Sequence, residues 1–286
     1  MTIELVFITY QRLEYTKLAL ASVLADPTEE FSLTIWDNAS TDGTPAYLRN
    51  EVSDPRIADI VLSKENVGQT AAVNEVWGRS KADLLGKLDN DCIVTPGWTR
   101  TLAQAHRDIE PLGVVACWHF FSDDFDYDRA RHKIQTFGSH RIFRHPWTCG
   151  TGLLIKKTDF QDFGPIPGQA TTQYWLRMAA AGRINGFYYP LIYQEHMDDP
   201  KSRHCLMHGA GSFERYREVT FGLCAGRYHD MDSRMTLRRE VVRNLLEDPF
   251  APQYYLGWRR KMRSLRARAS RLLSWPRARR TGSGRR

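Results

Sequence analysis

Short runs of aliphatic and β-branched residues alternate with helix-period segments through the first hundred residues of this chain. The runs predict strands, and the segments between them space their apolar residues as an α-helix does. The predicted strands are Ile3–Thr9, Leu33–Trp36, Ile60–Leu62 and Leu84–Leu88, and the predicted helices cover 14–25, 44–51 and 68–80. This rhythm indicates an α/β fold with a mainly parallel sheet flanked by helices.

Each predicted strand ends in a cluster of polar residues. The clusters are Thr9-Tyr10-Gln11-Arg12, Asp37-Asn38-Ala39-Ser40, Lys64-Glu65-Asn66 and Asp89-Asn90-Asp91. In an open α/β sheet the ligand lies beyond the carboxyl ends of the strands, which is where these clusters converge. We therefore expect one ligand site assembled from residues far apart in the sequence.

The rest of the chain follows the pattern less regularly. Predicted helices cover 98–109, Thr172–Ala181 and Thr236–Leu246, and predicted strands cover Val114–Cys117, Thr151–Ile155 and Ile184–Tyr189. The polar and aromatic segment Ser122–Trp147 is interpreted as a loop or lid, and 197–235 has too weak a periodicity for assignment. Pro249 and Pro252 mark a boundary near residue 250.

Basic residues are concentrated at one end of the chain. There are 40 Lys and Arg against 33 Asp and Glu, a net charge of +7, yet residues 259–286 hold twelve of the basic residues and no acidic one. The remaining body is acidic, which argues against a nucleic-acid-binding platform. Apolar residues at 258, 262, 265, 269 and 272 leave two main readings of the tail, a disordered basic end or a helix lying on an anionic membrane surface.

The spacing of the cysteines and the hydropathy of the chain predict where in the cell the protein is found. The five cysteines are irregularly spaced and form no CxxC pair, which argues against a disulfide framework or structural zinc and fits a reducing compartment. The first apolar run carries an acid where an export signal has basic residues, and no run approaches the roughly 18 apolar residues that span a bilayer. We expect a cytoplasmic protein, either soluble or peripheral at the inner face of the membrane.

The strongest chemical signal is the pair of carboxylates in Asp89-Asn90-Asp91, at the end of an apolar strand. Period-two geometry places both on the same side. Two converging carboxylates suit Mg²⁺ or Mn²⁺, which leave coordination positions open for substrate phosphates. A lone DxD is also typical of a solvated turn, so its context matters. The chain has neither GxGxxG nor GxxxxGK[ST], so a dinucleotide site and a P-loop lack their fingerprints.

Four motifs in this order resemble the GT-A glycosyltransferases of family 2. They are Phe7-Ile8-Thr9-Tyr10-Gln11-Arg12, the run Trp36-Asp37-Asn38-Ala39-Ser40-Thr41-Asp42-Gly43-Thr44, Glu65-Asn66-Val67-Gly68 with Asn74, and Leu88-Asp89-Asn90-Asp91. The resemblance covers about residues 3–100. It implies one Rossmann-like GT-A catalytic domain over 1–250, with a nucleotide-sugar-binding half at 1–98 and an acceptor half at 99–250, followed by a basic tail at 251–286.

The resemblance also implies cofactors and residue roles. It implies Mn²⁺ or Mg²⁺ and a UDP-, GDP- or dTDP-linked sugar donor. The residues it assigns to the donor are Thr9, Tyr10, Arg12, Asp37, Asn66, Gly68, Asp89 and Asn90, with Asp37 accepting a hydrogen bond from the base. The residues it assigns to the metal are Asp89, Asp91 and His196, with His204 and His208 as lesser candidates.

One part of the family pattern is missing. Inverting members place an acidic cluster before a Leu-Arg-x-x-x-x-Gly helix, where it acts as general base on the acceptor hydroxyl. Here Leu176–Gly182 matches the helix, but 168–174 contain no acid. Three alternatives stay open: a relocated base, a retaining mechanism in which the leaving phosphate takes the proton, and a non-catalytic relative. The candidate bases are Glu195, Asp198, Asp199, Asp162 and the pair Asp123-Asp124.

Together these features indicate a metal-dependent hexosyltransferase acting on a hydroxyl of a saccharide or lipid-linked acceptor, in polysaccharide or glycolipid synthesis. Aromatic residues between Trp118 and Trp147 are candidates for contact with acceptor sugars. One rival is a catalytically degenerate protein that binds sugar nucleotides or glycans. Another is a nucleotidyltransferase, against which stands the absence of glycine in Thr9–Arg12.

Overall fold

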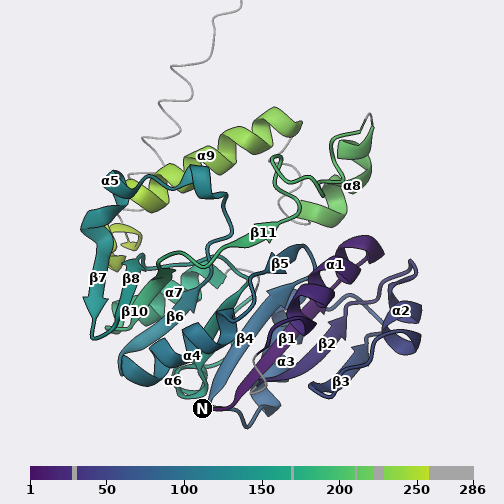
Figure 1. The fold of residues 1–286 in the computed structure, drawn as a ribbon, viewed down its shortest axis with the longest axis horizontal. Helices are drawn as coiled ribbons and strands as arrows, with labels where there is room; N and C mark the ends of the chain where they lie inside the picture. The colour runs from purple at the N-terminus through teal and green to yellow at the C-terminus, as the bar shows by residue number, and fades with distance from the viewer. Residues whose placement is uncertain (28–30, 169–170, 210, 222–228, 258–286) are drawn as a thin grey trace, which may run out of the picture.

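The computed structural model describes residues 1–27, 31–168, 171–209, 211–221 and 229–257 (Figure 1). Within these residues the main sheet has nine strands in the order β3-β2-β1-β4-β9-β6-β10-β8-β7, and a small second sheet pairs β11 with β5. The strands are β1 (Ile3–Thr9), β2 (Phe31–Asp37), β3 (Ile57–Leu62), β4 (Leu84–Asp89), β5 (Cys92–Val94), β6 (Leu112–Ala116), β7 (Ile134–Phe137), β8 (His140–Arg144), β9 (Leu153–Lys156), β10 (Ile184–Tyr189) and β11 (Gln194–His196).

The helices alternate with the strands in the first half of the chain and cluster near its end. They are α1 (Leu13–Leu24), α2 (Thr44–Asn50), α3 (Gln69–Arg79), α4 (Trp98–Asp108), α5 (Tyr127–Ala130), α6 (Lys157–Phe163), α7 (Thr171–Ala180), α8 (Ser212–Phe221) and α9 (Met231–Glu247). No helix in the described part of the chain is long and apolar enough to cross a membrane. Of the predicted basic tail at 251–286, the structure describes only residues 251–257.

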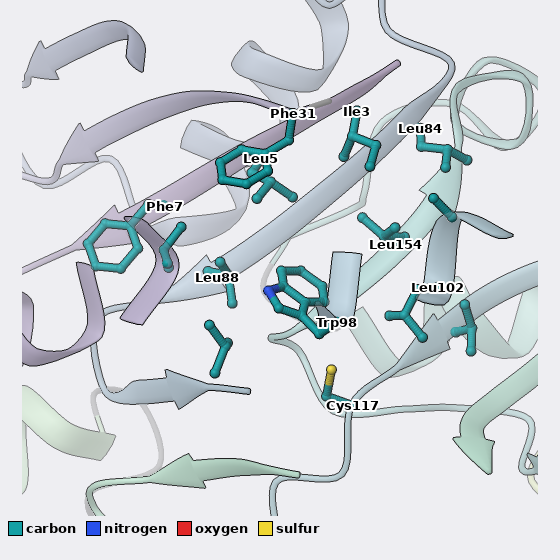
Figure 2. Packing of buried hydrophobic residues seen from close by; sticks show 14 of the residues in the cluster. Ile3, Leu5, Phe7, Phe31, Leu84, Leu88, Trp98, Leu102, Cys117 and Leu154 are labelled. Carbon is teal, nitrogen blue, oxygen red and sulfur yellow. The ribbon is translucent and has the colours of Figure 1, made fainter. Parts of the chain in front are cut away.

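Helices cover both faces of the sheet, and this explains the apolar character of its central strands. Ile3, Leu5 and Phe7 of β1 are buried in one apolar cluster with residues of α1, α2 and α4, part of which is shown in Figure 2. Val6 and Ile8 point the other way, into a second cluster with residues of α3, α6, α7 and α9. A strand buried on both faces has no polar alternation, so β1 reads as a nearly continuous apolar run.

The α/β fold is confirmed, but the sheet is parallel only in part. Strands β3, β2, β1 and β4 run parallel, as do β6 and β10. Strand β9 runs antiparallel between β4 and β6, and β8 runs antiparallel to both β10 and β7. The crossover rhythm that predicts parallel strands is confined to the first half of the chain, where the sheet is indeed parallel.

The interpretation of Ser122–Trp147 as a loop or lid is wrong. The segment contains α5, β7 and β8, and the two strands extend one end of the main sheet. Ile142 and Phe143 of β8 are fully buried. Charged residues flank these two on both sides, so the five-residue strand lacks an alternation long enough to recognise. In the unassigned region 197–235 the structure places α8 and the first turn of α9.

His106 makes the fold sensitive to acid. This α4 side chain is buried, its Nε2 lies 3.1 Å from the carbonyl oxygen of Leu154, and burial lowers the pKa of His106 from 6.5 to about 3. The unfolded chain takes up a proton below about pH 6.5, whereas the folded chain does so only near pH 3. The free energy of unfolding should therefore fall by about 2 kcal/mol between pH 6.5 and pH 5 from this residue.

The test is urea unfolding of the wild type and His106→Gln at pH 7 and pH 5. Glutamine keeps a donor for the Leu154 carbonyl but does not titrate, so the variant should lose about 2 kcal/mol less on acidification. His132→Gln, at an exposed position, is the matched control and should respond to pH as the wild type does. An equal loss in all three proteins would contradict this role for His106.

Candidate active site

The carboxyl ends of β1, β2 and β4 meet at one edge of the sheet. Thr9 pairs in register with Asp37, and Ile8 pairs with Asp89. A cleft of about 500 Å³ opens over this edge. Seven of the residues predicted to hold a nucleotide sugar or a metal line the cleft: Tyr10, Arg12, Asn66, Gly68, Asp89, Asn90 and Asp91. Residues 218–220 of α8 form part of its wall.

Arg12 pairs with two acidic side chains, Asp91 of the cleft and the buried Asp198. Its Nη1 lies 2.6 Å from Oδ2 of Asp198, and its Nη2 lies 3.4 Å from Oδ2 of Asp91 and donates to Oδ1 of Asn90 at 3.2 Å. Burial alone lowers the pKa of Arg12, but the carboxylates of Asp198 and Asp91 outweigh it and raise that pKa above its usual value. Arg12 is therefore a fixed positive charge beside Asp91.

Thr9 and Asn90 form a hydrogen-bond network next to the cleft. The Nδ2 of Asn90 donates to Oγ1 of Thr9 at 3.2 Å, to the carbonyl of Gln11 at 3.1 Å and to Oγ1 of Thr16 at 3.0 Å. Thr9 is fully buried and is not part of the cleft wall. Its hydroxyl lies 2.7 Å from that of Thr16 in α1, and its contact with the donor stays a prediction.

Asp89 forms an ion pair with Lys87, a buried lysine that is not among the predicted site residues. The Nζ of Lys87 lies 2.6 and 2.8 Å from the two carboxylate oxygens of Asp89 and donates to the carbonyl of Gly150 at 2.7 Å. Burial raises the pKa of Asp89, and the ammonium group of Lys87 opposes that rise. The carboxylate remains a quarter exposed at the cleft. The signal that was available is a lysine inside an otherwise apolar strand.

The predicted base-binding residues lie at the ends of β2 and β3. Asp37 is buried, its Oδ2 accepts a hydrogen bond from the backbone of Ser40 at 3.0 Å, and its buried Oδ1 has no partner in the described structure. An unpaired buried acceptor is costly unless a ligand completes it. Asn66 accepts from the amide of Gly68 at 2.9 Å, and Gly68 has a φ of 80°, which favours glycine.

His196 lies beside Asp91 because β11 pairs with β5. In that ladder His196 is opposite Cys92, and its Nε2 lies 4.0 Å from Oδ2 of Asp91. Burial lowers the pKa of His196 to about 3, so the imidazole is neutral. Burial opposes ionisation of Asp91, yet His196, the charge of Arg12 and the hydrogen bond from Cys92 together hold the pKa of that carboxyl below its usual range.

These donors fit a divalent cation. Asp91, Cys92 and His196 each offer a ligand atom, the three atoms lie within 4.8 Å of one another, and no comparable group occurs elsewhere in the described residues. The Nδ1 of His196 is buried without a partner in the described structure. A neutral imidazole beside an ionised carboxylate is the donor pair that divalent transition ions prefer. His204 and His208 do not join this group.

A second cavity of about 430 Å³ is lined in part by β11. Its lining residues are His119, Phe120, Phe121, Ser122, Tyr193, Gln194, Glu195, Lys201 and Arg203. The ring of His119 is centred 5.6 Å from that of His196, so this cavity approaches the metal-binding group. Two of the predicted aromatic residues, Phe120 and Phe121, therefore face a cavity, whereas Trp118 is fully buried.

The candidate bases differ in whether they reach the second cavity. Asp198 and Asp199 are buried to 1% exposure and form ion pairs with Arg12 and Arg238, respectively. Glu195 lines the second cavity, and its Oε1 accepts a hydrogen bond from Ser202 at 2.6 Å. Asp123 and Asp124 pair with Lys201, which lines the same cavity, but they are not among its lining residues, and Asp162 lies 3.6 Å from Arg183. Among these carboxylates Glu195 has the placement of a group that meets a ligand.

The fold is that of the GT-A glycosyltransferases. A mannosyltransferase from Pyrobaculum calidifontis, solved with GDP-Man and Mn²⁺, aligns with a TM-score of 0.57 at 16% identity, over 95% of this chain and 87% of that one. S. aureus TarS, solved with UDP-GlcNAc, aligns with a TM-score of 0.52 at 12% identity, over 86% of this chain and 74% of that one.

The sequence identifies the family. The model of glycosyl transferase family 2 matches residues 4–183, more than half of the chain, and the protein belongs to that family. No curated protein sequence matches this chain. The matched region contains the cleft residues from β1 to β5, whereas β11, which carries Glu195 and His196, lies beyond it.

Proposed function

We propose that this protein is a metal-dependent glycosyltransferase that moves a hexosyl group from a nucleotide sugar to a hydroxyl of a saccharide or lipid-linked acceptor. The observation that carries the proposal is the meeting of Asp89, Asp91 and His196 at the carboxyl edge of the sheet, beside a cleft large enough for a nucleotide sugar. Membership of the family and GT-A neighbours solved with GDP-Man or UDP-GlcNAc support the class of donor.

The residues divide the work by their places in the cleft and beside it. Asp37 does not line the cleft, but its neighbour Asn38 does, and Asp37 receives an N–H of the base at its unpaired Oδ1. Asn66 and Gly68 line the cleft and let the backbone approach the nucleoside. Asp89, fixed by Lys87, accepts hydroxyl groups of the ribose or the donor sugar. Asp91 and His196 hold Mn²⁺ or Mg²⁺, and when bound this ion stabilises the charge on the departing diphosphate.

Glu195 is proposed as the relocated base. It lines the second cavity, where Phe121 and Tyr193 offer apolar faces to an acceptor sugar, and it is next to His196 in β11. A carboxylate there can take the proton from the acceptor hydroxyl as that oxygen attacks.

Glu195→Gln should lower the rate of sugar transfer by about 10²- to 10⁴-fold, because the amide cannot accept that proton. Affinity for the donor should change little, since Glu195 is not part of the donor cleft. Transfer is measured with radiolabelled donor and nucleotide affinity by calorimetry, with the half-exposed Glu247→Gln as the matched control. Unchanged transfer would remove Glu195 from the reaction and favour a retaining mechanism.

The class itself is tested with a panel of UDP-, GDP- and dTDP-linked sugars incubated with Mn²⁺ or Mg²⁺, with EDTA as control. Metal-dependent release of nucleoside diphosphate from one donor supports the proposal. Tight nucleotide binding without release in the presence of oligosaccharide and lipid-linked acceptors would favour a binding protein. Release of pyrophosphate from a nucleoside triphosphate and a sugar phosphate would favour a nucleotidyltransferase.

The proposed setting is the inner face of a membrane, in the synthesis of polysaccharide or glycolipid. The basic composition of 259–286 supports attraction to anionic lipid. In this arrangement residues 1–98 bind the donor, 99–250 receive the acceptor, and the tail at 251–286 brings the domain to the lipid surface. Vesicle cosedimentation of the full chain with and without 259–286 tests this placement.

A further inference from the structure

Cys92 brings a sulfur atom into the proposed metal centre. Its Sγ lies 3.4 Å from Oδ1 of Asp91, to which the thiol donates, while Nε2 of His196 lies 4.0 Å from the other oxygen of that carboxylate. The ligand atoms of the three residues are all within 4.8 Å of one another. The antiparallel register of β5 and β11, which sets His196 opposite Cys92, creates this arrangement.

Asp89 is less available to an ion than its place in the DxD pair suggests. Both of its carboxylate oxygens lie within 2.8 Å of the ammonium group of Lys87. Direct coordination by Asp89 would weaken this contact and leave the buried lysine with only the carbonyl of Gly150. Asp91 has a weaker competing contact, because Arg12 lies 3.4 Å from one of its oxygens, and its ligand atom lies within 4.8 Å of those of His196 and Cys92.

The chemistry of this set differs from that of an all-oxygen site. Carboxylate, imidazole and thiolate together are ligands of Zn²⁺ and Co²⁺, whereas Mg²⁺ takes oxygen and avoids sulfur. The other cysteines of the described structure lie apart from this group. The thiol is fully buried, so the protein holds it toward the carboxylate rather than toward solvent.

We propose that Sγ of Cys92 is the third protein ligand of the metal centre, with Asp91 and His196, and that the centre selects ions of the Zn²⁺ and Co²⁺ class over Mg²⁺. This inference rests on the metal site of the proposed function. When the sulfur–metal bond forms, the S–H bond breaks and its proton passes to the buffer. No oxidant or reductant takes part.

The test is titration of the full-length protein with Co²⁺. A bound thiolate should produce a sulfur-to-cobalt charge-transfer band in the near ultraviolet, and Cys92→Ser should abolish that band and weaken Co²⁺ about 10- to 100-fold. Mg²⁺ affinity should change little. The control is Cys149→Ser, which removes a buried thiol outside the centre. A missing band in the wild type, or a band that persists in Cys92→Ser, would overturn the proposal.

Two further measurements keep the outcome decisive. Cadmium NMR of the wild-type protein reports sulfur coordination without a substitution, so misfolding of Cys92→Ser would not obscure the answer. Sugar-nucleotide turnover with Mn²⁺ separates this inference from the proposed function. Turnover without sulfur coordination would support the proposed transferase and contradict the proposal that Cys92 binds the metal. Sulfur coordination without turnover on any donor would support Cys92 as a ligand and contradict the proposed transferase.

Discussion

Asp91→Asn should reduce metal-dependent release of nucleoside diphosphate by about 10³-fold or more. The substitution keeps the shape of the side chain but removes the negative charge that Asp91 brings to the group of ligand atoms it forms with Cys92 and His196. The loss should appear in two independent readouts, calorimetric affinity for Mn²⁺ and turnover of the donor that the panel identifies.

The matched control is Asp59→Asn. Asp59 is about half exposed, pairs with Arg79 on the surface and does not line the cleft, so binding and turnover should stay at wild-type levels. Normal Mn²⁺ affinity in Asp91→Asn would remove Asp91 from the metal centre. Lost affinity with normal turnover would instead remove the metal from the reaction.

Arg12→Met should lower the free energy of unfolding by about 3–5 kcal/mol, because it strips the buried carboxylate of Asp198 of its closest cation. Both side chains are almost fully buried, at 6% and 1% exposure, so water cannot solvate the abandoned charge. Adding Asp198→Asn should restore part of the loss, since the pair is then replaced by neutral groups.

The matched control is Arg79→Met, which breaks an exposed ion pair. Arg79 and Asp59 form a pair at 2.8 Å with nearly half of each side chain exposed, and breaking it should cost less than about 1 kcal/mol. Urea unfolding of the two single variants and the double variant measures all three values. Equal small losses for Arg12→Met and Arg79→Met would show that the Arg12 pair contributes little to stability.

The chemistry at the end of β4 was predictable because it depends on local sequence. Polar residues that follow an apolar strand lie at its carboxyl end, and both Asp89, the last residue of β4, and Asp91, in the turn after it, line the cleft. The fate of those carboxylates was not predictable in the same way. Asp89 is clamped by Lys87 and Asp91 by Arg12, and each clamp depends on burial and on which neighbour the fold brings near.

His196 and Cys92 also separate what the sequence could predict from what only the structure shows. The sequence suggested His196 only by resemblance, and it gave no reason to place Cys92 in a metal centre. A ladder of three residue pairs between β5 and β11 brings them together across a hundred residues of chain. Strand pairs between distant short segments leave no periodic trace in either segment.

The sequence by itself determined the α/β architecture, the edge of the sheet where the cleft lies and the carboxylates there, because hydrophobic periodicity and strand polarity act over a few neighbouring residues. The tertiary structure decided which of those groups are paired and which face a cavity. It buried Asp198 and Asp199 against arginines and left Glu195 at an open wall. Charge pairing and access depend on distances through space, and packing alone sets those distances.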